Sequence, residues 1–363
     1  MSGIKCAVVA AFFGPYYNNF PASLAAFDQK MKSEGNAVFY VFPDKVRDYA
    51  WVERIRALNP DVYFVRFAPY SLGNVCKMRA IFKKEKPDII YSHMSGWDVT
   101  VRFAAPTLPV IWHMHMNTNV STRKKRARNW VKFHILGFGK TYHIAVSQPG
   151  TDAINSLKPH NQCVFLPNAL DFSRLTIDDA ARKQVQTPTV LLFGWAPYVK
   201  GADLAIDACE RLNAAGTAVK LCISAQDETY AYVKKRFSDQ PEWLELLPPT
   251  DDVSKLYQRA TIMLSASRSE GFSYALLEAL YMGLPLVCSD IPGTSWTKEF
   301  QAVRTFPSEN VEELIAQLQA AITHGITAEE IRANRALLKR EYSLDSWTEA
   351  AVKIISDTVK QGK

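Results

Sequence analysis

The sequence has no apolar run as long as the roughly 18 residues that a membrane-spanning helix needs. It also lacks a basic N-terminal stretch followed by a small-residue cleavage site, so we expect no signal peptide. The six cysteines are scattered, and none stands in a Cys-x-x-Cys pair. Such cysteines are typical of small buried side chains in a reducing compartment, rather than of disulfides or a zinc site. We therefore expect a cytoplasmic protein.

Several ligand-binding motifs are missing as well. No Asp-x-Asp pair occurs, and no group of His, Cys, Asp or Glu has metal-site spacing, so we expect no metal. The run 137–142 (GFGKTY) lacks the third glycine of G-x-G-x-x-G, and a P-loop would need glycine in place of His134. No recognised nucleic-acid motif is present. We expect no bound cofactor and no nucleic-acid partner.

Acidic residues are scarce in the first half of the chain. Residues 1–170 hold 22 Lys and Arg against 10 Asp and Glu, a net charge of +12. Residues 171–363 hold 21 against 26, a net charge of −5. This split indicates two domains with different partners. A basic first domain suits an anionic acceptor, an anionic membrane surface or nucleic acid.

The chain does contain a regular series of short apolar runs. They are CAVVAAFF, AVFYVF, DVYFVRF, DIIYSH, VIWHMH, HIAVS and CVFLPNA in the first half, and TVLLFG, VKLCISA, ATIMLSAS and LPLVCSD in the second. Amphipathic segments such as 202–212 and 274–282 separate these runs, which is the pattern of parallel strands covered by helices on both faces. We predict two doubly wound α/β domains, each binding its ligand beyond the carboxyl ends of the strands.

The predicted domains are residues 1–170 and 171–342. The segment 171–188 is polar and ends just before a new strand, so we place the linker there. The last stretch, 343–363, predicts a helix that packs back toward the first domain.

The strongest motif is the segment 261–293, which predicts a strand, a loop, a helix, a glycine stop and another strand. Glu270 stands at the mouth of the helix, and Glu278 lies about two turns inside it. The amides expected to form an anion site there belong to Gly271, Phe272, Ser273 and Tyr274. Gly271 lets the backbone approach a phosphate, and a neighbouring carboxylate can accept hydrogen bonds from sugar or ribose hydroxyls. The alternative is that both glutamates are solvated on the helix surface.

This segment resembles the signature of the retaining GT-B glycosyltransferases, and glycosyltransferase family four in particular. The matching residues are Glu270, Gly271, Phe272, Glu278, Gly283 and Pro285. The resemblance implies two Rossmann-like domains that face an interdomain cleft. It also implies that Glu270 binds hydroxyls of the donor sugar and that Glu278 binds the nucleotide ribose. The missing Asp-x-Asp pair argues against the other, metal-dependent single-domain glycosyltransferase architecture.

A second stretch, LLFGWAPYVKGAD, resembles the glycine-after-strand element of the same family. It supplies Gly194 to the donor site and Lys200 as the cation for the donor diphosphate. The family usually has Arg where this chain has Trp195. We predict that Arg268 takes over that charge. The alternative for Lys200 is a solvated surface side chain.

In the first half, VIWHMHMN resembles the family's strand that ends in a histidine facing the reacting carbon. His115 is that histidine, and it can donate a hydrogen bond to a hydroxyl of the donor sugar. His113 and His93 stand at similar positions, where structural roles remain open. Gly14 occupies the first strand–helix turn, where the family has two glycines near phosphate, but Pro15 removes one amide donor.

The run 122–138 combines six Lys and Arg with apolar residues in near-helical spacing. Its cluster Arg123–Lys132 predicts a basic amphipathic helix that docks on an anionic membrane, where a lipid-linked acceptor would lie. Two alternatives stay open: a solvated helix whose apolar face packs on its own domain, and nucleic-acid binding.

Together these features predict a retaining glycosyltransferase. It would move a sugar from a nucleoside-diphosphate sugar, most simply a UDP-sugar, to a hydroxyl of a glycan or lipid-linked acceptor. Such a reaction belongs to the synthesis of cell-surface polysaccharides or glycoconjugates, at the inner face of the plasma membrane. Two alternatives are a nucleotide-sugar epimerase of the same fold and a non-catalytic partner subunit. The departures at Pro15 and Trp195 motivate the second.

Overall fold

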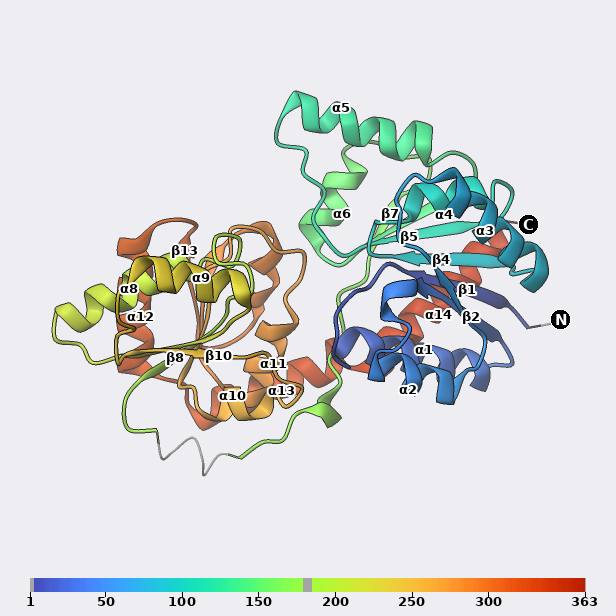
Figure 1. The fold of residues 1–363 in the computed structure, drawn as a ribbon. Helices are drawn as coiled ribbons and strands as arrows, with labels where there is room; N and C mark the ends of the chain where they lie inside the picture. The colour runs from blue at the N-terminus through green and yellow to red at the C-terminus, as the bar shows by residue number, and fades with distance from the viewer. Residues whose placement is uncertain (1–2, 179–184, 363) are drawn as a thin grey trace. The chain divides into compact units, whose positions relative to one another are not determined.

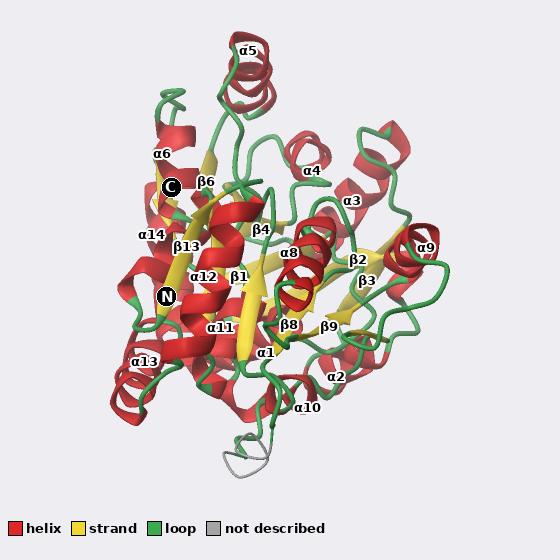
Figure 2. Ribbon diagram, turned by 90° about the vertical axis from the view of Figure 1, so that its left-hand side faces the viewer, coloured by secondary structure: helices red, strands yellow, loops and turns green. Residues whose placement is uncertain are grey.

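The computed structural model describes residues 3–178 and 185–362. The chain divides into two compact units: Met1–Ala169 with Leu344–Lys363 (unit 1), and Leu170–Ser343 (unit 2). Each unit is built on one parallel β-sheet flanked by helices (Figure 1), and Figure 2 distinguishes the helices from the strands by colour. In the described part of the chain, no helix combines the length and the apolar character that crossing a membrane requires.

The sheet of unit 1 has the strand order β3-β2-β1-β4-β5-β6-β7. Its strands are β1 (Lys5–Ala10), β2 (Ala37–Pro43), β3 (Val62–Val65), β4 (Ile89–His93), β5 (Val110–Met114), β6 (Thr141–Ala145) and β7 (Cys163–Phe165). Each overlaps one of the predicted apolar runs, although β1, β2 and β6 extend one or two residues beyond their runs. The central strands β1, β4 and β5 are almost entirely buried, because helices cover both faces of the sheet.

The helices of unit 1 connect these strands, except for the C-terminal helix, which follows unit 2 in the chain. They are α1 (Asn19–Ser33), α2 (Ala50–Leu58), α3 (Leu72–Glu85), α4 (Asp98–Ala104), α5 (Arg123–Val131), α6 (Gln148–Asn155) and α14 (Leu344–Gln361), with short turns η1 (Asp44–Val46) and η2 (Lys132–Leu136). The C-terminal helix α14 packs along α1, where the rings of Phe27 and Trp347 lie 6.4 Å apart.

The sheet of unit 2 has the order β10-β9-β8-β11-β12-β13. Its strands are β8 (Thr189–Phe193), β9 (Lys220–Ser224), β10 (Leu244–Leu247), β11 (Ile262–Ser265), β12 (Leu286–Asp290) and β13 (Val303–Pro307). Its helices are α8 (Ala202–Ala214), α9 (Asp227–Arg236), α10 (Ser254–Gln258), α11 (Tyr274–Met282), α12 (Val311–His324) and α13 (Ala328–Glu341), with short turns η3 (Phe172–Arg174) and η4 (Pro292–Glu299).

The two edge strands of this sheet, β10 and β13, are absent from the predicted runs. Both carry polar or charged residues, and most of their side chains are only partly buried. An edge strand has a neighbour on one side only, so it needs less apolar surface than a central strand. The period of apolar residues therefore gives a weak signal for such strands.

The first part of the predicted linker, 171–188, is packed on unit 2 instead of connecting the two units as a free segment. Leu175 is buried, and the Thr176 amide donates to Ser254 Oγ at 3.0 Å. The segment packs there because Leu175 buries apolar surface. The otherwise polar composition of the segment did not indicate this contact. The middle of the linker, 179–184, lies outside the described residues.

Candidate functional site

The predicted donor residues of unit 2 line a hollow of about 300 Å³ at the carboxyl ends of β8 and β11. Six of them contribute to its wall: Lys200, Glu270, Phe272, Ser273, Tyr274 and Glu278. The hollow lies where ligands bind in doubly wound sheets, beyond the strand ends. Its wall also includes Trp195, which is 50% exposed.

Lys200 and Glu270 form an ion pair, with Lys200 Nζ 2.7 Å from Glu270 Oε1. Ser267 Oγ donates to the same carboxylate oxygen at 2.7 Å. The ammonium also lies 5.2 Å from the centre of the Trp195 ring, a cation–π distance. An ammonium has three N–H donors, so the bond to Glu270 leaves donors for a phosphate.

Two glycines allow this pair to form. Gly201 has a φ of 70°, and a Cβ there would lie 2.0 Å from the Ala266 carbonyl oxygen. A Cβ on Gly293 would lie 2.2 Å from the carbonyl oxygen of Glu270. Glycine at these positions thus lets the Lys200 turn and the Glu270 backbone approach their neighbours closely.

Glu278 is 6% exposed and lies on the inner face of α11. Tyr257 Oη donates to its Oε2 at 2.7 Å, and an Arg174 guanidinium nitrogen lies 3.3 Å from Oε1. Burial raises the pKa of the Tyr257 phenol well above its ordinary value, and the Glu278 carboxylate raises it further. A solvated surface position for Glu278, the alternative from the sequence, is therefore wrong.

The helix α11 begins at Tyr274, with Ser273 as its N-cap residue. Ser273 makes no side-chain capping bond, so the first-turn amides are available to an anion that enters the hollow. Gly271 and Phe272 belong to the loop before this turn rather than to the turn itself. The prediction that their amides complete a helix-terminal anion site is corrected to that extent.

Arg268 has partners that conflict with its predicted role. Its guanidinium binds both carboxylate oxygens of Asp203, at 2.9 and 2.8 Å, and Nε donates to Glu309 at 3.0 Å. It also stacks on the ring of Tyr198, with 3.9 Å between guanidinium carbon and ring centre. Two carboxylates neutralise the charge of Arg268, and its contacts hold the turn before Lys200 in place. The proposed diphosphate site therefore does not include Arg268.

Gly194 follows β8 but does not line the hollow. A Cβ there would lie 2.7 Å from Ile223 Cγ2, and its carbonyl accepts a hydrogen bond from Thr229 Oγ1. This glycine serves the packing of the strand end against β9. Its contribution to the donor site stays a prediction.

The other two predicted residues lie at the carboxyl edge of the sheet in unit 1. Gly14 lies in the turn after β1, and its carbonyl accepts a hydrogen bond from Trp51 Nε1 at 2.9 Å. His115 follows β5 and is partly buried. Burial lowers the pKa of its imidazole to about 3, so the ring is neutral at physiological pH.

The sequence shows no group of His, Cys, Asp or Glu with metal-site spacing, but the fold brings three histidines together. His93, His113 and His115 form a group whose candidate ligand atoms lie within 4.8 Å of one another. Two neighbouring strand ends bring them together, a non-local arrangement that short spacings along the chain do not reveal. Three ring nitrogens of the group are hydrogen-bonded: His93 Nδ1 with His115 Nε2 at 3.1 Å, and His113 Nδ1 with Tyr91 Oη at 2.8 Å. The buried Nε2 atoms of His93 and His113 have no hydrogen-bond partner in the described part of the chain.

Sequence reasoning missed the polar partners of the two glutamates: Ser267, Tyr257 and Arg174. Arg174 follows the apolar run CVFLPNA by only a few residues, and a cation just after that run is a signal that could have been used. Tyr257 lies on α10, and no local pattern connects it to α11.

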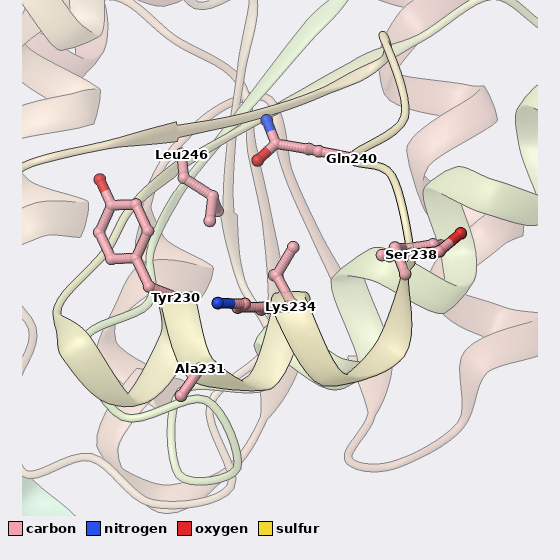
Figure 3. Close-up of a pocket in the computed structure, with 8 residues that line it drawn as sticks. Tyr230, Ala231, Lys234, Ser238, Gln240 and Leu246 are labelled. Atoms are coloured by element: carbon pink, nitrogen blue, oxygen red, sulfur yellow. The ribbon is translucent and has the colours of Figure 1, made fainter.

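A second hollow, of about 320 Å³, lies between α9 and the end of β10. Figure 3 shows Tyr230, Ala231 and Lys234 on α9, with Gln240 and Leu246 across from them. Its wall contains one charged side chain, Lys234, and none of the predicted site residues. No converging set of polar groups supports a role for it.

Two family models match the chain. One, described as glycosyltransferase family 4, matches residues 30–174, and one described as glycosyl transferases group 1 matches residues 187–324. A 74-residue stretch is 36% identical to the GtfA subunit of the UDP-N-acetylglucosamine–peptide N-acetylglucosaminyltransferase of Streptococcus pneumoniae serotype 4. That stretch is 19% of this chain and only 15% of the curated relative.

Solved structures are similar over nearly the whole length. A glycosyltransferase from Rickettsia africae ESF-5 has a TM-score of 0.78 at 14% identity, with coverage of 99% of this chain and 100% of that one. Anabaena HepE in complex with UDP has a TM-score of 0.77 at 16% identity, with coverage of 98% and 100%. These identities show the fold, and the two family models add the class of enzyme. The chain is therefore a GT-B glycosyltransferase, with a glycosyltransferase family 4 domain in its N-terminal half and a group 1 domain in its C-terminal half.

Proposed function

We propose that this enzyme transfers a sugar from a UDP-sugar to a hydroxyl of a glycan or lipid-linked acceptor, with retention at the anomeric carbon. One observation carries the proposal: Lys200, Glu270, Glu278 and the start of α11 converge on one hollow at the strand ends of unit 2. Anabaena HepE, which shares the fold, has been solved with UDP and with UDP-glucose. This supports UDP as the nucleotide.

In this proposal the donor is held by complementary polar groups. The ammonium of Lys200 and the first-turn amides of α11 stabilise the departing diphosphate, where the largest negative charge develops. Glu270 orients the sugar hydroxyls and Glu278 the ribose. His115 donates to a hydroxyl of the donor sugar. The leaving phosphate takes the proton of the acceptor, so the reaction needs no separate protein base.

The helix α5 supports an anionic membrane as the place of the acceptor. None of its residues is buried, and in Figure 1 it stands apart from the sheet of unit 1. Next to its basic side chains, Trp130 is 45% exposed and Ile135 is 56% exposed. A solvent-exposed helix with basic and aromatic side chains suits the surface of an anionic bilayer. The alternative in which the apolar face of the run 122–138 packs on its own domain holds for η2, where Phe133 is buried in the core of unit 1, but not for α5.

The predicted cluster Arg123–Lys132 needs one correction. Lys132 turns inward, and its Nζ lies 3.3 Å from the carboxylate of the fully buried Asp98. Arg126 is tied to the Ser156 carbonyl at 2.6 Å. The cations that we propose for the membrane are therefore Arg123, Lys124, Lys125 and Arg128. On this basis we propose peripheral attachment at the inner face of the plasma membrane.

Thermal-shift measurements with UDP-, GDP- and ADP-sugars test the donor. A ligand at 100 times its dissociation constant stabilises the protein by about 2.7 kcal/mol, so a true donor gives a clear shift. NMR of the glycoside formed then reports the anomeric configuration, and an inverted product would reject retention. An epimerised donor without transfer would identify the epimerase alternative, and binding without turnover the partner-subunit alternative.

A further inference from the structure

His115 is hydrogen-bonded to a second, fully buried histidine, His93. His93 is the last residue of β4, its exposed fraction is 0%, and its Nδ1 lies 3.1 Å from His115 Nε2. Phe20, at the start of α1, packs edge-on against both rings at 5.4 Å. The pair is thus held by packing as well as by its hydrogen bond.

The surroundings of His93 decide which nitrogen carries the proton. Burial lowers the pKa of both rings, so each is neutral and carries one proton. His93 Nε2 is buried, and no described residue is its hydrogen-bond partner. A buried N–H without an acceptor is rarer and less favourable than an acceptor without a donor. The unpartnered Nε2 is therefore the bare nitrogen, and the proton of His93 lies on Nδ1.

This assignment determines the tautomer of the second ring. His93 Nδ1–H donates to His115 Nε2, so His115 must carry its own proton on Nδ1. Among the described residues His115 makes no other hydrogen bond. Its Nδ1–H is left to donate to an oxygen of a ligand.

We propose that His93 is a positioning residue for glycosyl transfer, which fixes His115 as the tautomer that donates a hydrogen bond from Nδ1 to the donor sugar. This inference rests on the proposed function, in which His115 contacts that sugar. It adds that the matching substrate atom is an acceptor oxygen, and that a buried residue without substrate contact sets the direction of the bond.

The neighbouring pair gives a matched control. Tyr91 and His113 belong to the same two strands, and Tyr91 Oη bonds His113 Nδ1 at 2.8 Å. Tyr91→Phe removes the hydroxyl that binds His113 and keeps the ring that packs on His93, with 4.1 Å between the ring centres. A general effect of weakening the cluster would appear in both variants, whereas a tautomer effect would appear only on changing His93.

The test compares His93→Leu, His93→Asn and His93→Gln with Tyr91→Phe. The amide nitrogen of Asn occupies the position of imidazole Nδ1 and can donate to His115, whereas that of Gln corresponds to Nε2. We expect kcat/KM for the UDP-sugar to fall about 10-fold or more in the Leu and Gln variants, since misplacement by about 1 Å can cost about 10²-fold. The Asn variant and Tyr91→Phe should stay within about threefold of wild type. The Kd of UDP should not change in any of them.

The tautomer itself is read by ¹⁵N NMR of the labelled protein, independently of turnover. We expect Nδ1–H at His115 in the wild type and the Asn variant, and a mixture of tautomers in the Leu variant. An Nε2–H tautomer in the wild type would overturn the proposal, as would equal activity of the Asn and Gln variants. Uptake of one Zn²⁺ per chain that His93→Leu abolishes would also overturn it, because the nitrogens would then be metal ligands. The expected tautomers with unchanged kcat/KM in every variant would instead reject the role of His115 in the proposed function.

Discussion

At the scale of single residues, the two glutamates of the signature differ in their partners. Glu270 is paired with Lys200 at the wall of the hollow, whereas Glu278 is buried between Tyr257 and Arg174. A buried carboxylate with two fixed partners is pre-organised to accept further hydrogen bonds from a diol such as ribose. A carboxylate that shares a lysine can instead exchange partners when a diphosphate arrives.

This difference predicts separate effects of removing each carboxylate. Glu278→Ala should raise the Kd of both UDP and the UDP-sugar by about 10- to 100-fold, the scale of one lost charge-assisted hydrogen bond. Glu270→Ala should raise the Kd of the UDP-sugar only, because the substitution leaves Lys200 free to bind the diphosphate of UDP itself. Calorimetric titration with both ligands measures the two losses.

Glu309→Ala is the control, since Glu309 binds Arg268 outside the wall of the hollow. Its affinities should match those of the wild type. Equal losses for both ligands in both glutamate variants would contradict the division of roles between Glu270 and Glu278.

At the scale of elements, the turn before α8 presents Lys200 to the hollow. The positive φ of Gly201 and the 2.0 Å approach to Ala266 bring this turn against the end of β11. Arg268, also from the end of β11, holds the same turn through Asp203 and through a bond from its amide to the Val199 carbonyl at 2.9 Å. The position of Lys200 in the hollow thus depends on residues that need not touch the donor.

Gly201→Ala should therefore destabilise the protein and weaken the binding of UDP. The left-handed conformation alone costs about 1–2 kcal/mol for a residue with a Cβ, and the clash with Ala266 adds to this. Gly216→Ala is a matched control, because Gly216 has a φ of 86° but no atom within 4 Å of its Cβ position. Chemical denaturation and UDP titration of both variants check the prediction. Unchanged UDP affinity in Gly201→Ala would show that the turn does not position Lys200.

The exposed helix α5 carries the prediction about the membrane. Replacing Arg123, Lys124, Lys125 and Arg128 with Ser should abolish co-sedimentation with anionic vesicles, because each basic residue near such a surface contributes about 1 kcal/mol. Binding of the wild type should fade at high salt, since exposed charges are screened beyond about 10 Å at 0.1 M. Neutral vesicles should bind neither protein.

A variant with Lys234, Lys235, Lys255 and Lys339 changed to Ser controls for net charge, because these exposed lysines lie in unit 2. It should bind anionic vesicles as the wild type does. If the wild type does not co-sediment with anionic vesicles at low salt, α5 is only a solvated helix and the acceptor need not be lipid-linked.

At the scale of the whole molecule, three buried histidines of unit 1 and the partly buried His115 make stability depend on pH. Burial lowers the pKa of His115 and His143 to about 3, and the pKa values of His93 and His113 well below the ordinary 6.5. The unfolded chain binds these protons near pH 6.5, whereas the folded chain stays neutral there. The stability is therefore complete above pH 6.5 and is lost as the pH falls toward the folded pKa values.

The loss is about 1.4 kcal/mol per histidine for each pH unit below 6.5. At pH 5.5 it reaches about 6 kcal/mol for the four, a large part of the 5–15 kcal/mol that holds a typical domain together. Urea denaturation between pH 7.5 and 5.5 should show this decrease. A variant that removes one of them, His143→Phe, should show a smaller slope, and a free energy of unfolding that stays constant over this range would contradict the assignment of neutral buried rings.

The class of fold and the positions of the central strands along the chain follow from local features of the sequence. Central parallel strands are buried on both faces, so each shows as an apolar run, and the glutamate signature lies within one strand–loop–helix unit whose spacing is local. By contrast, tertiary structure alone decided the partners of these residues. Arg268 is bound by Asp203 and Glu309, Lys132 turns inward to Asp98, and His93 meets His115, all pairs brought together by chain segments distant in sequence. The physical reason is that periodicity reports which face of an element is buried, whereas a charge or a proton finds its partner only after the elements have packed.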